Sequence, residues 1–374
     1  MEYAHLGIYS DLVDEAHRQQ DLFPLAEPGP LTVQQARLAL GFCDLPEIPM
    51  QVQVDGRWEG DGLAGERLSW WVGYGPRTQA WLFKPAAASG ALPAVLALHD
   101  HGGFKFYGKE KIAEGPEPAN PTQQAWFASA YGGRAWVNAL AKRGFVVLVP
   151  DTFLWGSRKF PLETMEKAMN LGFPGNVPFR QDSSGLDEIA YYNFYAGHHE
   201  HLVAKYCNLL GTCLAGVVAH EDRIALNYLL TRPDVQADQL GCLGLSGGGN
   251  RAVLLRAMSD PLKAAGVVGL MSTYPELLDH SIYTHTWMFF PSNYARFGDW
   301  PDLAACRAPR PLLVQYDTED ELFTLKGMKD AHARLLAHYA RMPEAYTGQF
   351  YPGPHKFDVE MQEAAFDWLE EWLC

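Results

Sequence analysis

Residues 244–248 read Gly-Leu-Ser-Gly-Gly, a G-x-S-x-G pattern between a short apolar segment and a helix-like one. A sharp turn from strand to helix strains the backbone of its central serine, and it leaves no room for side chains at the flanking positions. Glycine is therefore needed on both sides. The pattern predicts that Ser246 is a nucleophile presented on such a turn, and the alternative is an ordinary glycine-rich turn.

A serine hydroxyl attacks at neutral pH only if a base, normally histidine, takes its proton and a carboxylate orients that base. The segment FYPGPHKFD places His355 after the last strand-like segment, where it is the expected base. The segment PRPLLVQYDTEDELF offers four candidate acids just after another strand-like segment: Asp317, Glu319, Asp320 and Glu321. Asp320 is favoured because it lies one short turn beyond the strand, within reach of a histidine on the neighbouring loop; Asp317 remains open.

Acyl transfer also needs backbone N–H groups that face the developing oxyanion. Gly247, directly after the serine, is expected to supply one, and the loop after an early strand the other. The segment LALHDHGGFK ends such a strand, and Gly103 is preferred there over Gly102 because glycine lets the backbone approach a ligand closely. His99 and His101 could bind a metal, but their spacing brings no third ligand, so neither a metal nor another cofactor is expected.

Two further groups of side chains lie in long segments that interrupt the regular pattern. The sequence GHHEH at 197–201 places His198 and His201 where they could share a helix face, but the zinc pattern H-E-x-x-H is absent. A solvated or cleft-lining role is favoured for them. Trp155 and Trp287 lie in or beside segments expected to cap a cleft, so they either line a substrate-binding surface or simply pack the cap onto the edge of the sheet. His101, in the loop after the early strand, is a further candidate substrate-binding residue.

The elements around these motifs alternate between short apolar strands and amphipathic helices, which predicts an α/β fold with a mostly parallel sheet covered on both faces. The first strand-like segments, RLSWWVG, TQAWLFKP and PAVLALHD, are separated by Gly and Pro and suggest an antiparallel opening to the sheet. We expect a helical N-terminal extension over 1–66 and one α/β domain over 67–374, with cap-like insertions at about 157–215 and 272–308.

Composition excludes several classes of partner. The 374 residues include 30 basic and 44 acidic ones, and the net charge of -14 should repel nucleic acid and anionic membranes. No run of about 18 apolar residues exists, and the first residues lack the order of a secretory signal. We therefore expect a soluble cytoplasmic protein that acts on a small molecule. Its six cysteines include no C-x-x-C pair and are expected to be free thiols.

Taken in this order, the motifs resemble the α/β-hydrolase superfamily, and more narrowly the branch of dienelactone-hydrolase-like proteins and acetyl xylan esterases. The segments that carry the resemblance are DRIALNYLLTRPDVQADQLGCLGLSGGGNRA, LHDHGGFK, APRPLLVQYDTEDELF and GPHKF. The resemblance covers roughly residues 67–374. It implies a serine carboxylester hydrolase with an acyl-enzyme intermediate and no metal, in which Ser246 is the nucleophile, Asp320 the acid, His355 the base and Gly103 part of the oxyanion loop.

The sequence departs from this family at two positions: the family often has a larger residue where Gly247 stands and a glycine where Asp317 stands. Dienelactone hydrolases proper, within this branch, have a cysteine nucleophile at the place of Ser246. Ordinary ester cleavage is therefore favoured, with carbohydrate acetyl esters among the candidate substrates. Two alternatives are a serine peptidase of the prolyl-oligopeptidase type, for which a propeller domain is missing, and a non-catalytic binding module on the same fold.

Overall fold

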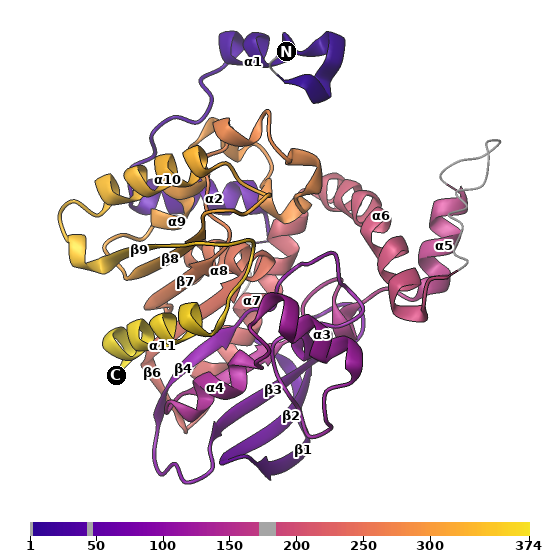
Figure 1. Cartoon of the computed structure of the whole chain (residues 1–374), viewed down its shortest axis with the longest axis vertical. Coiled ribbons are helices and arrows are strands. Elements are labelled where there is room, and N and C mark those ends of the chain that lie inside the picture. The colour runs from indigo at the N-terminus through magenta and orange to yellow at the C-terminus, as the bar shows by residue number, and fades with distance from the viewer. Residues whose placement is uncertain (1–2, 43–47, 172–184) are drawn as a thin grey trace.

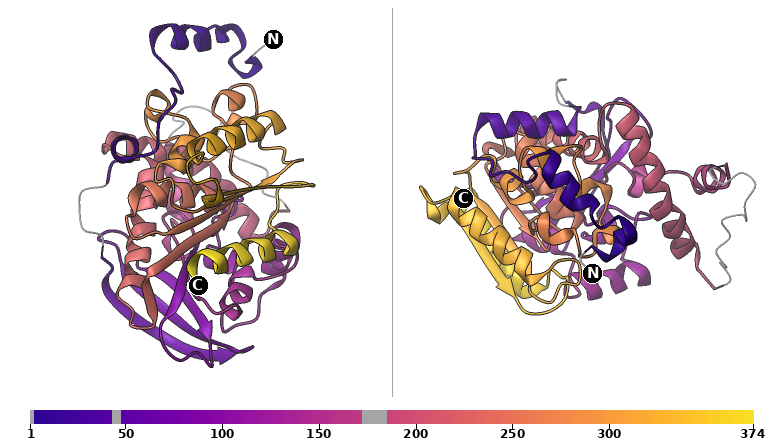
Figure 2. Two further views of the ribbon diagram at one scale, coloured as in Figure 1. Left: turned by 90° about the vertical axis from the view of Figure 1, so that its left-hand side faces the viewer. Right: turned by 90° about the horizontal axis from the view of Figure 1, so that it is seen from above.

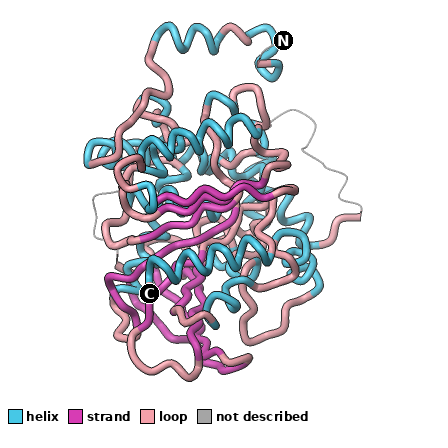
Figure 3. The backbone as a smooth tube through the Cα atoms, turned by 60° about the vertical axis from the view of Figure 1, so that its left-hand side comes forward, coloured by secondary structure: helices cyan, strands magenta, loops and turns pink. Residues whose placement is uncertain are grey.

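A computed structural model describes residues 3–42, 48–171 and 185–374 of the chain. Its centre is a nine-stranded sheet in the order β1-β2-β3-β5-β4-β6-β7-β8-β9 (Figures 1 and 3). The strands are β1 (Met50–Gly60), β2 (Leu63–Trp71), β3 (Thr78–Pro85), β4 (Leu92–Ala97), β5 (Val146–Pro150), β6 (Val235–Leu245), β7 (Ala264–Val268), β8 (Leu312–Asp317) and β9 (Tyr346–Tyr351). The pairs β1–β2, β2–β3 and β3–β5 are antiparallel, and the strands from β5 to β9 are parallel to one another.

Helices cover both faces of this sheet, as the apolar runs in its central strands require (Figure 3). The helices are α1 (Leu12–Gln19), α2 (Pro30–Leu40), α3 (Pro121–Ala130), α4 (Trp136–Lys142), α5 (Leu162–Leu171), α6 (Glu188–Leu209), α7 (Leu214–Leu230), α8 (Gly247–Met258), α9 (Trp300–Ala305), α10 (Leu325–His338) and α11 (Val359–Leu373). One apolar core joins α2, α7, α8, α9 and α10 to one face of the sheet, and a second joins α3, α4 and α11 to the other.

The sheet begins earlier in the chain than the sequence predicted. The helical extension expected over 1–66 ends at Leu40, and β1 already forms an edge strand from Met50. Its sequence, MQVQVDGRWEG, alternates apolar and polar residues at first, but the strand is exposed along most of its length and lacks a continuous apolar run. The expected antiparallel opening holds for the first three strands, whereas β4 is parallel to both of its neighbours.

Both predicted insertions begin at the carboxyl edge of the sheet. The first follows β5 and contains α5 and α6, which project from the body in Figure 1; its residues 172–184 lie outside the described part. The second follows β7 and consists of short 3-10 helices and α9. The helix α1 stands away from the rest of the chain in Figure 1 and in the left-hand view of Figure 2.

No single described helix is both long enough and apolar enough to cross a bilayer. The pair α6 and α7, bent by 85° at the break between them, passes that test only when the two are taken together.

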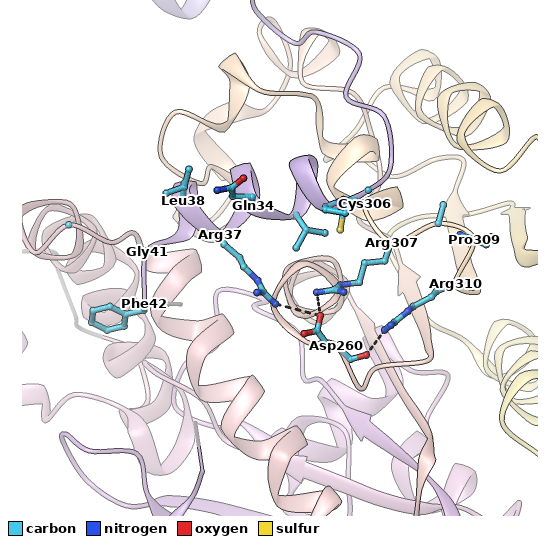
Figure 4. A pocket seen from close by; sticks show the side chains of 15 residues that line it. Gln34, Arg37, Leu38, Gly41, Phe42, Asp260, Cys306, Arg307, Pro309 and Arg310 are labelled. Atoms are coloured by element: carbon cyan, nitrogen blue, oxygen red, sulfur yellow. Dashed lines mark hydrogen bonds and ion pairs between the residues drawn. The ribbon is translucent and has the colours of Figure 1, made fainter. Parts of the chain in front are cut away.

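Two arginines hold the C-terminal end of α8 and a third holds the chain just after it; Figure 4 shows all three around Asp260. Arg37, from α2, donates from Nε to the carbonyl of Ala257 at 3.3 Å, and Arg307 donates from Nη2 to the same carbonyl at 3.2 Å. Arg310 donates from Nη1 to the Asp260 carbonyl at 2.5 Å. The last carbonyls of a helix lack partners within it, and their partial negative charge favours cations. The N-terminal extension therefore supports the helix that begins directly after Ser246.

Replacing Arg37 with alanine should lower the free energy of unfolding by about 1–2 kcal/mol, because hydrogen bonds from a charged donor to helix carbonyls are lost. Urea unfolding followed by tryptophan fluorescence measures this. Arg18→Ala is the matched control, since Arg18 on α1 pairs with the nearby Glu15 at the surface. Equal midpoints for the two variants would show that α2 does not support α8.

Candidate active site

Ser246 sits on a strained turn between β6 and α8. Its backbone has φ 56° and ψ -120°, a conformation that side-chain-bearing residues rarely adopt. Its amide donates to the carbonyl of Val268, at the end of β7, at 2.8 Å, and its own carbonyl accepts from the amide of Asn250 at 2.9 Å. Ser246 is half-buried between buried neighbours. The turn predicted from the G-x-S-x-G pattern is therefore present, with the serine at its apex.

The glycines beside Ser246 are required by close backbone contacts. A Cβ atom on Gly244 would lie 2.5 Å from the carbonyl oxygen of Leu98, and one on Gly248 would lie 2.1 Å from the same oxygen. A Cβ atom on Gly247 would lie 2.5 Å from the amide nitrogen of His101. These contacts explain the glycine at 247, where the resembling family often has a larger residue: the loop after β4 occupies that space.

His355 and Asp320 meet at the carboxyl edge of the sheet. They lie on the loops after β9 and β8, which are parallel neighbours, and His355 Nδ1 is 2.6 Å from Oδ2 of Asp320. The other oxygen of Asp320 accepts from the amide of Leu322 at 2.8 Å. Burial alone would lower the pKa of His355, but the hydrogen bond and the charge of Asp320 raise it above its usual value. Its Nε2 is buried and has no partner among the described residues.

The imidazole lies beside the strand ends that hold Ser246. Gly269 follows Val268, whose carbonyl accepts the Ser246 amide. A Cβ atom on Gly269 would lie 3.0 Å from Cε1 of His355 and 3.0 Å from Cδ1 of Leu245. The serine, the histidine and Asp320, far apart in the sequence, are thus brought to neighbouring positions on one edge of the sheet.

Asp317 is a second carboxylate beside the histidine. Ligand atoms of Asp317, Asp320 and His355 lie within 4.8 Å of one another. Its Oδ2 accepts from the amide of Lys356 at 3.1 Å, while its Oδ1 has no partner among the described residues. Burial raises the pKa of Asp317 to about 7. Of the four acids that the sequence left open, Asp320 is the one hydrogen-bonded to the histidine, and Glu319 and Glu321 are exposed.

The loop after β4 uses its polar groups internally. The amide of Gly103 donates to Nδ1 of His101 at 3.0 Å, and Nε2 of the same ring lies 2.9 Å from Oε2 of Glu200. Both ring nitrogens of His101 are therefore occupied. The backbone nitrogen of His101 lies against Gly247, and neither its N–H nor that of Gly247 at the start of α8 has an acceptor within the described ranges.

The other candidate residues differ in how accessible they are. Trp155 is buried, and its ring packs against those of His99 and His101, with centroids 5.9 Å and 5.2 Å away. Trp287 is 41% exposed, and its Nε1 donates to Nδ1 of His201 at 2.8 Å. Of the predicted substrate-binding residues, Trp287 alone presents a large accessible ring.

His198 makes a local contact in α6, with Nδ1 3.0 Å from the carbonyl of Phe194. His99 is buried in the loop after β4, where its Nδ1 lies 3.1 Å from the carbonyl of Asp100, and burial lowers its pKa well below the usual value. These histidines are held separately, by different local groups.

Buried ion pairs beneath the loop were not predicted from the sequence. Arg251, one turn into α8, pairs with Asp222 of α7 at 2.6 Å and donates from Nη1 to the carbonyl of His99 at 3.1 Å. Asp100 pairs with Lys111 at 3.0 Å and accepts from the hydroxyl of Tyr131 at 2.5 Å. No motif spacing links these residues, because their partners come from different elements.

Comparison with known proteins identifies the fold. No protein-family model matches the chain. A glucuronoyl esterase from Solibacter usitatus superposes with a TM-score of 0.63 at 15% identity, over 92% of each chain. Acetyl xylan esterase 1 from Thermoanaerobacterium sp. JW/SL YS485 superposes with a TM-score of 0.55 at 14% identity, over 94% of this chain and 97% of that one. The chain has the α/β-hydrolase fold.

One sequence relative of the chain is named as a hydrolase. The Bacillus subtilis (strain 168) protein named "Putative hydrolase YtaP" is 22% identical over 300 residues, which make up 79% of this chain and 84% of that protein. The predicted fold class, with its mostly parallel sheet and antiparallel first strands, is confirmed. The resemblance to acetyl xylan esterases is likewise confirmed at the level of the fold.

Asp317→Asn should make the protein more stable than wild type at about pH 8.5 and leave it similar at about pH 4. In the wild type, Asp317 keeps its proton in the folded state up to a pKa of about 7, whereas in the unfolded chain it ionises near its ordinary value of 3.8. Folded-state stability therefore falls as the pH rises between these values, and an uncharged amide avoids that loss. Thermal unfolding at both pH values measures it.

Glu319→Gln, an exposed neighbour, serves as the control and should show no such pH-dependent difference. A stability gain for Asp317→Asn that is the same at both pH values would contradict the titration of Asp317.

Proposed function

We propose that this α/β-hydrolase is a serine carboxylester hydrolase with Ser246 as nucleophile, His355 as base and Asp320 as the orienting acid. The observation that supports this best is the 2.6 Å contact between His355 Nδ1 and Asp320, which leaves Nε2 of the histidine without a partner among the described residues. That nitrogen lies at the sheet edge where the strained turn presents the serine. A serine, a histidine and an acid in this arrangement are typical of the fold.

The proposed reaction has two steps. Asp320 accepts a hydrogen bond from the Nδ1–H of His355, so that Nδ1 keeps its proton and the lone pair is on Nε2. Nε2 can then take the Ser246 proton as the serine oxygen attacks the ester carbonyl. The histidine then gives that proton to the leaving alkoxide, and the acyl group stays on the serine oxygen. In the second step, water loses a proton to His355, attacks the acyl-enzyme and releases the carboxylic acid and the free serine.

The oxyanion would be held by backbone amides at the start of α8 and in the loop after β4. The sequence pointed to Gly247 and Gly103. The Gly103 amide already donates to Nδ1 of His101, so we propose the amides of Gly247 and His101 as the pair. The His101 nitrogen lies against Gly247, and donors fixed in advance in this way are worth most where charge develops in the transition state.

For the substrate class, we propose carbohydrate esters. The structural neighbours named above are glucuronoyl and acetyl xylan esterases, and Trp287 offers an exposed flat ring on the second insertion, suited to stacking on a sugar face. Cleavage of a peptide amide in place of an ester, or binding without turnover, would be the competing outcomes on this fold.

Ser246→Ala should abolish hydrolysis of p-nitrophenyl acetate and labelling by a fluorophosphonate probe, while the thermal unfolding temperature stays close to that of the wild type. The alanine keeps the turn but removes the only atom that attacks, and loss of a triad nucleophile typically costs about 10⁶-fold in kcat. Activity retained by this variant would refute the proposed nucleophile. Unlabelled wild-type protein would favour the non-catalytic module.

Asp320→Asn should lower kcat by about 10³- to 10⁴-fold, because the amide no longer holds the imidazole in the tautomer that leaves Nε2 free. Glu319→Gln is its exposed neighbour and should leave kcat nearly unchanged. Initial rates with the same ester measure both variants. If Asp317→Asn instead gave the large loss and Asp320→Asn did not, the acid would be Asp317.

A further inference from the structure

Glu200 is a buried carboxylate at which three distant parts of the chain meet. It lies on α6 in the first insertion and is 5% exposed. Its Oε2 accepts from Nζ of Lys105 at 2.5 Å and lies 2.9 Å from Nε2 of His101, both on the loop after β4. Its Oε1 accepts from the hydroxyl of Thr286 at 2.7 Å and from the amide of Trp287 at 3.0 Å, both in the second insertion.

These four contacts offset the cost of burying the charge. A carboxylate removed from water is strongly destabilising unless it is paired and hydrogen-bonded. Burial alone would raise the pKa of Glu200, but the Lys105 ammonium and the His101 ring hold it well below its usual range. Lys105 is itself enclosed, since it also donates to the carbonyl of Ala196 at 3.0 Å and lies 5.5 Å from the centre of the Trp155 ring. Glu200 is therefore a fixed negative charge.

That charge determines which nitrogen of His101 carries the proton. The Gly103 amide donates to Nδ1, so Nδ1 supplies a lone pair, and the proton is on Nε2, where it is donated to Glu200. Burial lowers the pKa of His101 and keeps the ring neutral. The imidazole is thus a rigid link between α6 and its own loop, with no nitrogen left to act on a substrate.

The contact from Glu200 through the His101 ring leads to the backbone amide of His101, which lies against the turn at Ser246. After His101 the loop continues through Gly102 and Gly103, which have φ of 57° and 63°. Glycine adopts this conformation readily but also adopts others, so these two residues do not by themselves hold the loop in one conformation. The His101 ring holds this segment by accepting a hydrogen bond from the Gly103 amide. The backbone nitrogen and the Cβ of His101 lie 2.5 Å and 2.7 Å from the position that a Cβ on Gly247 would take. A shift of the ring would move that nitrogen relative to Ser246.

We propose that Glu200 is a positioning residue for the reaction: through the His101 imidazole it fixes the His101 amide as an oxyanion donor, and through Thr286 and Trp287 it holds the exposed Trp287 ring on the same support. This inference rests on the proposed function. Glu200 touches no reacting atom, and its effect is on the placement of groups that do.

The test compares Glu200→Gln, His101→Ala and the double variant, with kcat and KM for p-nitrophenyl acetate. The neutral amide in Glu200→Gln cannot attract both the lysine and the imidazole N–H, and alanine at 101 removes the link but keeps the backbone amide. Each single variant should lose about 10- to 100-fold in kcat with KM changed by less than about 3-fold, as expected for a misplaced oxyanion donor. The double variant should lose no more than the larger single loss, since both act by one route.

Glu221→Gln is the matched control. Glu221 is also a buried carboxylate, paired at 2.5 Å with Arg158, and both side chains are 1% exposed. It has no contact with the loop after β4 among the interactions of the described residues. Its loss should lower the unfolding temperature and leave kcat within about 3-fold.

The outcomes separate this inference from the proposed function. Unchanged kcat for folded Glu200→Gln, or losses that multiply in the double variant, would overturn the inference while Ser246-dependent esterase activity stood. If Glu200→Gln does not fold, folded His101→Ala decides, and normal kcat for it overturns the inference. Ester hydrolysis that persists in Ser246→Ala would instead refute the proposed function.

Discussion

The candidate site at the carboxyl edge of the sheet depends on one close contact between two backbone segments. The end of β4 and the loop after it pass so close to the first turn of α8 that no side chain fits between them. The carbonyl of Leu98 lies where Cβ atoms on Gly244 and Gly248 would be, and the His101 amide lies where a Cβ on Gly247 would be. This packing forces the three glycines. It also places backbone amides beside the strained residue of the turn, Ser246. A single steric constraint therefore sets both the conformation of Ser246 and the backbone groups around it.

Buried ion pairs around this contact hold the loop after β4 in place. Arg251 with Asp222 and Lys111 with Asp100 lie beneath or beside it, and every one of these side chains is almost fully buried. Replacing such pairs with apolar residues is often neutral or stabilising in proteins, so their energetic contribution alone does not account for them. Their geometry does: each pair also binds a backbone carbonyl of the loop, that of His99 or of Asp100. We interpret them as fixing position more than adding stability.

Much of the fold and part of the candidate site could be predicted from the sequence, for reasons that differ between elements. The turn at Ser246 is determined locally by glycines, and the apolar runs of β5 and β6 by burial on both faces, so their patterns are visible in a short window. The strand β1 was missed because an exposed edge strand has no apolar run to mark it.

Residues whose role depends on distant partners were harder to predict. Asp320 could be favoured but not separated from Asp317, since the choice depends on where His355 points. In the sequence GHHEH the histidines are the residues whose type suggests a ligand, whereas the glutamate between them, Glu200, makes the long-range contacts. No spacing rule reports a partner that is about a hundred residues away.

The contacts of Glu200 on α6 with two other segments also limit how the insertions of this fold can be exchanged. An insertion that contacts only itself can be exchanged between related proteins as a unit, but this one is joined through Glu200, in the middle of α6, to residues from two other segments. Exchanging α6 alone would leave a lysine and an imidazole facing an empty position. The junction must be inherited or engineered as a set, so changes of specificity by loop grafting are constrained to versions that bring Lys105 and Thr286 with Glu200.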